Sequence, residues 1–330
     1  MDNPQKRRKF APNRSRHTSF HKECNRPRLH FFMEYTKQPL SLLQQIETLR
    51  KRGLIIDDDH EAMIVLDRTS YFRLADYWRP MEADKNSHIF KPNCHFSDIV
   101  AIYRFDTELK QVIFNTILQI EVAMRSKMIR FFSTNHDSFW FANEDLSEDA
   151  ACFQSNIAHI RREIQRSQEE FITEHFAKYD KPEFPPVWKT LEVLTLGTLS
   201  KLYTNFSDHA AKSLLAKDFG LPQHLILGSW LASITVLRNK CAHHARVWNR
   251  RYPVMPELPR KTTLPWITNY NIHPYKLYPQ LCCIAYWINS IEPQNTFTQD
   301  IKALLEKYTI VNPTAMGFPA GWHNEPLWQQ

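Results

Sequence analysis

The segment LRNKCAHHARVWNR, at residues 237–250, brings together the residue types that acid–base and phosphate chemistry uses. In a continuous helix, Asn239 and His243 lie four residues apart and share a face. Arg238 and His243 are five residues apart, which separates them by about 140° around the helix and about 7.5 Å along it. One irregular turn after Ala242 would let both side chains point into one cleft.

An arginine beside a histidine is suited to chemistry on phosphodiesters. The histidine titrates near neutral pH and can act as a general acid or base. The guanidinium group can bind a phosphate and stabilise the charge that builds on it. RNA carries its own nucleophile, the 2′-hydroxyl, so such a reaction needs no metal ion. In this interpretation Asn239 orients the histidine or the phosphate.

The spacing of Arg238 and His243 is weakly specific by itself, because arginine followed by four to six residues and a histidine recurs in the chain. The other examples are Arg14 with His21, Arg16 with His21, and Arg130 with His136. A second interpretation therefore stays open. The segment would be a helix end whose arginine and histidine satisfy carbonyl groups and pair with acids.

A third interpretation is a metal site built from Cys241, His243 and His244. Three adjacent donors rarely converge on one ion, and no second pair of ligands stands out in the sequence. The sequence also lacks the HExxH, nucleophile-elbow and paired-carboxylate motifs. We therefore expect no metal at this segment.

Glycine is scarce, with six residues in a chain of 330. Loops that cradle phosphates need clustered glycines, because their backbone N–H groups must approach the ligand closely. None of the six glycines belongs to such a motif. Nucleotide-binding folds of the P-loop and Rossmann types are therefore disfavoured, and we expect no small-molecule cofactor.

The cysteines and the hydropathy pattern predict a cytoplasmic protein. The six cysteines form no CxxC pair, as expected for a reduced chain whose thiols are mostly structural. The N-terminus lacks the apolar core of a signal peptide. No apolar run reaches the length of a transmembrane helix, so we expect no membrane association.

The positive charge is concentrated at the N-terminus. Residues 1–30 contain nine Lys or Arg and two acidic residues, which accounts for the formal net charge of +7. We predict a basic, flexible arm over residues 1–37 that binds a polyanion, with RNA or DNA the usual partner. A solvated tail without a specific partner is the alternative. The candidate RNA-binding residues of the arm are Lys6, Arg7, Arg8, Lys9, Arg14 and Arg16.

Apolar residues at helical spacing predict an all-α protein with few strands. Ser41 and Gln44 can form a capping box at the first helix. In residues 97–132, Asp106 could cap a break between two helices, and Glu121 and Arg125 can pair four residues apart. The predicted helices span residues 41–53, 58–78, 97–132, 151–178, 187–204, 208–219, 223–242, 278–291 and 297–309.

Five ordered segments resemble one known family, the Abi-like proteins of the AbiD/AbiF group of bacterial abortive-infection systems. The segment at residues 237–250 is similar to the family's signature, L-R-N-x-C-A-H-H-x-R-x-W-N-R. The other similar segments are RTSYFRLADYW (68–78), FSDIVAIYRFDTELKQVIFNTILQIEVAMRS (96–126), PPVWKTLEVLTLGTLSKLY (185–203) and MGFPAGWHNEPLW (316–328). The resemblance extends from about residue 38 to residue 328. Position 110 is Lys, where the family commonly has Arg.

The resemblance implies membership of the HEPN superfamily. The expected fold is a HEPN-type helical bundle, elaborated with extra helices and preceded by the basic arm. Residues 38–330 would form the domain. Its parts would be N-terminal helices over 41–78, a core over about 97–250, and C-terminal helices and a tail over 278–330.

Many HEPN proteins are metal-independent endoribonucleases, often with a site composed from two protomers. The resemblance thus implies an antiphage endoribonuclease that cuts RNA by 2′-hydroxyl attack, acts as a homodimer and binds a structured non-coding RNA. Arg238 and His243 would be the catalytic pair, with Asn239 as their polar neighbour. His244, Arg246 and Asn249 would shape the cleft or touch RNA, and Cys241 and Trp248 would be packing residues. The alternative is a non-catalytic protein that holds a structured non-coding RNA in a defence or toxin–antitoxin complex.

Overall fold

The computed structural model describes residue 36 and residues 38–329. The chain divides into two units, Met1–Leu40 and Ser41–Gln330, and every helix and strand below belongs to the second. The six predicted RNA-binding residues of the arm lie outside the described residues: Lys6, Arg7, Arg8, Lys9, Arg14 and Arg16.

The described chain is all-α, as predicted. A small antiparallel pair of strands, β1 (Glu82–Asp84) and β2 (Ile89–Phe90), was not predicted because each strand is too short to show a pattern. The α-helices are α1 (Leu42–Lys51), α2 (Asp59–Thr69), α3 (Tyr71–Trp78), α4 (Phe96–Ser133), α5 (Ala150–Arg166), α6 (Glu170–Lys178), α7 (Val187–Thr190), α8 (Leu196–Asn205), α9 (His209–Asp218), α10 (His224–Ala242), α11 (Tyr278–Ile291) and α12 (Phe297–Lys307).

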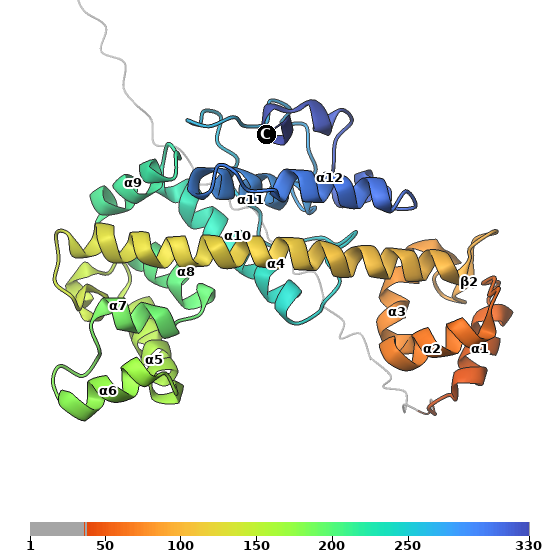
Figure 1. The fold of residues 1–330 in the computed structure, drawn as a ribbon, viewed down its shortest axis with the longest axis horizontal. Coiled ribbons are helices and arrows are strands. Elements are labelled where there is room, and N and C mark those ends of the chain that lie inside the picture. Colours follow the sequence, from red (N-terminus) through yellow and green to blue (C-terminus); the bar gives the residue numbers. More distant parts are fainter. Residues whose placement is uncertain (1–35, 37, 330) are drawn as a thin grey trace, which may run out of the picture. The chain divides into compact units, whose positions relative to one another are not determined.

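Helix α4 is the element around which the others pack. It is drawn in yellow in Figure 1 and contacts α3, α9, α10, α11 and α12. Its 38 residues contain no glycine or proline, so nothing in the sequence interrupts its backbone hydrogen bonds. Ile113, Ile117, Ile120 and Met124 form a buried stripe at helical spacing. The predicted break at Asp106 is therefore wrong, because this side chain is buried and bonded elsewhere rather than capping a helix.

Other predicted helices are divided by local hydrogen bonds. Ser70, at φ +70°, ends α2, and its hydroxyl accepts the N–H of Arg73 to begin α3. The predicted helix over 58–78 is thus two helices. The predicted helix over 151–178 is also two, α5 and α6. The predicted helix over 187–204 becomes α7, a 3-10 turn at Leu191–Val193, and α8.

The core lies where α10 and α11 pack against α4. The predicted stripe of α10 is buried, with Trp230, Ile234 and Leu237 each at most 1% exposed. In α11 all of residues 278–289 are buried. Because α10 is fixed along its length in this way, the position of its C-terminal end is also fixed.

None of the helices in the described part of the chain combines the length and the apolar character needed to cross a membrane.

Candidate functional site

The candidate segment begins inside α10 and continues through the turn that ends it. His243 is the C-cap, and His244 follows in the left-handed region at φ +52°. The N–H of Ala245 donates to the carbonyl of Lys240 (2.9 Å), and the N–H of His244 donates to that of Cys241 (3.0 Å). These bonds form a Schellman motif, in which glycine is usual at the position that His244 occupies. The helix thus ends at a defined turn.

The chain beyond this turn is held by the buried carboxylate of Asp106. Its Oδ1 accepts the backbone N–H groups of Val247 (3.0 Å) and Trp248 (2.6 Å). Its Oδ2 accepts the hydroxyl of Tyr77 (2.7 Å) and lies 3.0 Å from Nζ of Lys110. Asp106 is 0% exposed, so these four donors replace the water that its charge would otherwise bind.

Two arginines also fasten the turn to α3. Arg73 donates from Nη1 to the carbonyl of His244 (2.8 Å), and Arg246 donates from Nη1 to the carbonyl of Asp76. Farther along, Asn249, at φ +46°, accepts a hydrogen bond from Nζ of Lys276 (2.9 Å). Arg246 and Asn249, predicted to shape the cleft or touch RNA, thus use their side chains to hold the backbone after α10.

Arg238 lies against α4. Its Nε is 3.8 Å from Oε2 of Glu121, and its guanidinium carbon lies 5.7 Å from the ring centre of Phe114. Its Nη1 also donates to Oδ1 of Asn239 (3.4 Å). The predicted pair of Glu121 with Arg125 is confirmed at 2.5 Å, with Glu121 buried and Arg125 partly buried. The arginine of the candidate pair is therefore half-buried beside a carboxylate and oriented by contacts on two sides.

The structure brings together Arg238 and Asn239 but not Arg238 and His243. Within the described residues no hydrogen bond, ion pair or ring contact joins the side chains of Arg238 and His243. Because α10 stays regular to Ala242, the two side chains diverge by about 140° around it. Asn239, His243 and His244 are exposed, so they are free to meet a partner molecule.

Cys241 and Trp248 are buried, as predicted for packing residues. Burial raises the pKa of the Cys241 thiol to about 12, so the thiol stays protonated near neutral pH. In the part of the chain that the structure describes, three or more His, Cys, Asp or Glu side chains do not gather in a way that could hold a metal ion.

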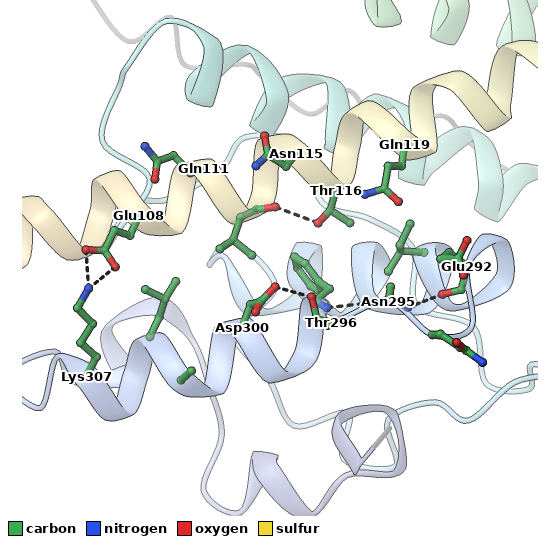
Figure 2. Close-up of a pocket in the computed structure, with 16 residues that line it drawn as sticks. Glu108, Gln111, Asn115, Thr116, Gln119, Glu292, Asn295, Thr296, Asp300 and Lys307 are labelled. Carbon is green, nitrogen blue, oxygen red and sulfur yellow. Dashed lines mark hydrogen bonds and ion pairs between the residues drawn. The ribbon is translucent and has the colours of Figure 1, made fainter.

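Two cavities open beside α4. One, of about 540 Å³, adjoins the candidate segment and is lined by side chains of α3, α4 and α10 together with His244. The other, of about 980 Å³, lies between α4 and the chain of α11 and α12. Figure 2 shows its two walls, with Gln111, Asn115 and Gln119 on α4 and Asp300 on α12, and the ion pair of Glu108 with Lys307 at one end. Of these two cavities, only the smaller is lined by one of the predicted site residues, His244.

Sequence reasoning missed the residues that hold the site in place: Arg73, Tyr77, Asp106 and Lys110. All four lie in the two segments, 68–78 and 96–126, that resemble the family, and of the four only Asp106 was predicted to have a role, as a helix cap. The sequence contained one indication of this role. Asp106 is an acidic residue within an apolar helical stripe, and a carboxylate buried there must have hydrogen-bond partners.

Comparison with known proteins gives one informative result. The family described as Abi-like protein matches residues 64–249. This range covers more than half of the chain and includes α3, α4, α10 and the candidate segment as far as Asn249. No curated protein and no solved structure matches the chain significantly.

The first prediction concerns the buried carboxylate of Asp106. Asp106→Asn should lower the free energy of unfolding by about 3–5 kcal/mol, because it turns an amide N–H toward groups that donate and leaves the charge of Lys110 unpaired. The matched control is Glu108→Gln, on the same helix and also paired with a lysine but partly exposed, which should change it by at most about 1 kcal/mol. Urea denaturation measures both, and equal effects would contradict the role given to Asp106.

The second prediction concerns the two histidines at the end of α10. His244→Gly should raise the free energy of unfolding by about 1 kcal/mol, because glycine adopts a positive φ without steric cost. His243→Gly should lower it by about 0.5–1 kcal/mol, because φ is −92° there and glycine only adds freedom to the unfolded chain. Thermal or urea unfolding of the two variants should give opposite signs, and a shared sign would contradict the assigned turn.

Proposed function

Because the chain belongs to the Abi-like protein family, which points to abortive infection as a defence against phage, we propose that it is a metal-independent endoribonuclease. Its site consists of Arg238, Asn239 and His243, and its substrate is RNA. A structured non-coding RNA is the proposed partner of the complex.

One observation carries the proposal. Asp106 and Arg73 fix the backbone that follows α10 by hydrogen bonds to its N–H and carbonyl groups. The side chains of Asn239, His243 and His244 nevertheless remain exposed. Holding the backbone rigid and leaving polar side chains free is what a site for a large ligand requires.

The proposed chemistry follows from the residue types. His243 removes the proton from a 2′-hydroxyl, and the 2′-oxygen forms a bond to the adjacent phosphorus. The bond from phosphorus to the 5′-oxygen breaks, and the leaving oxygen takes a proton from water. Arg238 binds the phosphate oxygens and stabilises the charge that grows on them. The products are a 2′,3′-cyclic phosphate and a 5′-hydroxyl.

We place the complete site in a homodimer. In one chain Arg238 and His243 diverge, which supports a site that two copies of the segment complete together. The face of α4 beside Arg238 offers an apolar surface for the second copy, because Leu118 is 41% exposed and Val122 is 63% exposed. A symmetric pair of chains would bring the same surface of each copy together.

The contact of Arg238 with Glu121 favours a second candidate, an RNA-binding protein that does not cut. A guanidinium already facing a carboxylate is a weaker ligand for phosphate, and His243 is not beside it. A single chain in this arrangement could hold a structured RNA through its shape and phosphates without cleaving it. Tightly bound RNA in the purified protein, together with no cleavage of any substrate, would favour this candidate.

The third prediction tests the proposed nuclease. Arg238→Ala and His243→Ala should each lower the rate of RNA cleavage by about 100-fold or more and abolish growth arrest in cells, because each removes a group that acts in the transition state. Cleavage is measured with purified protein in the presence of a chelator, and folding of each variant is checked by its unfolding transition.

The matched controls are Arg166→Ala on α5 and His60→Ala on α2, both exposed and both far along the chain from α10. They should retain cleavage and growth arrest. Full activity in both Arg238→Ala and His243→Ala would overturn the assignment.

A further inference from the structure

The smaller cavity beside α4 extends the candidate site. It is lined on α4 by Tyr103, Thr107, Gln111, Phe114 and Asn115, and at the end of α10 by His244. We propose that it binds an unpaired adenine of the RNA, next to the phosphate held by Arg238. This inference rests on the proposed function, because it names what the same site would recognise.

The polar groups of the cavity fit an adenine edge. Gln111 and Asn115 lie one turn apart, about 6 Å along α4. Both are exposed, and neither side-chain amide hydrogen-bonds to any described residue. An asparagine or glutamine amide offers a donor and an acceptor together, which pair with N7 and N6 of adenine. Two free amides on one wall are therefore available for this contact.

The aromatic groups fit the flat faces of bases. Phe114 and Tyr103 are both partly buried, so each presents part of a ring to the cavity. Unpaired bases stack on such rings. Arg238 does not line the cavity, but its guanidinium carbon lies 5.7 Å from the ring centre of Phe114, which does, so the proposed phosphate site adjoins this end of the cavity.

The charges that line the two cavities favour RNA binding in the smaller cavity over RNA binding in the larger one, which lies between α4 and α12. Among the described residues, the smaller cavity is lined by Arg73 and His244, by Lys110, whose charge the buried Asp106 balances, and by no acidic residue. Glu108, Glu292 and Asp300 line the larger cavity, with Lys307 as its basic residue. A phosphate backbone would be repelled from the larger cavity and attracted to the smaller one. Gln111 and Asn115 stand on α4 between the two, and Figure 2 shows them on that helix.

The fourth prediction uses an RNA library with randomised positions, cut by the purified full-length protein and then sequenced. Wild-type cuts should favour an adjacent adenine by about tenfold, which is the discrimination that a good amide contact provides. Gln111→Ala and Asn115→Ala should each reduce this preference to about twofold or less. Gln119→Ala is the matched control, since it removes an exposed amide of α4 that lines only the larger cavity.

The outcomes separate this inference from the proposed function. An adenine preference that Gln111→Ala and Asn115→Ala leave unchanged, or that Gln119→Ala reduces equally, overturns the inference while the nuclease stands. If the wild type cuts no RNA, the proposed nuclease fails. The inference is then decided by anisotropy of labelled single-stranded rA10, rC10 and rU10. Stronger binding of rA10 that is lost in Gln111→Ala and Asn115→Ala supports it, and equal binding of the three oligonucleotides overturns it.

Discussion

The structure around the candidate site depends on one buried charge. The carboxylate of Asp106 is removed from water and balanced by Lys110, the hydroxyl of Tyr77 and two backbone N–H groups of the chain after α10. A buried carboxylate is stable only when its oxygens are occupied in this way. The arrangement therefore joins α3 and α4 to the chain after α10, whose bonded residues are more than 140 positions from Asp106 in the sequence.

The side chains of the candidate segment therefore fall into two groups, those that hold the backbone and those that remain exposed. Arg246 and Asn249 turn inward to α3 and to Lys276, and they hold the backbone. Arg238 lies between Glu121 and Phe114, and His243 and His244 stay exposed. Since packing and hydrogen bonds fix the backbone, binding a partner requires no further ordering of the backbone in this segment. A site for RNA gains from this, because ordering a flexible loop opposes binding.

Local patterns were enough to predict much of this fold. The buried stripe of α10, the bounds of α11, the capping box of Ser41 with Gln44 and the ion pair of Glu121 with Arg125 all follow from spacings of three or four residues. The partners of Asp106 could not be found in this way, because Val247 and Trp248 are more than 140 residues away in the chain. The division at Ser70 was missed because one hydroxyl and one positive φ determine it. The surroundings of Arg238 could not be predicted either, because they depend on Glu121 and Phe114 of α4.

The central claim is that Arg238 and His243 promote attack by the 2′-hydroxyl of RNA. The most direct measurement maps one cut in a defined RNA and then replaces the 2′-hydroxyl at that nucleotide with hydrogen. Cleavage at that phosphate should stop, while other cuts in the same RNA continue, because the nucleophile has been removed at one place only. Continued cleavage at the modified position that still requires Arg238 and His243 would contradict the mechanism.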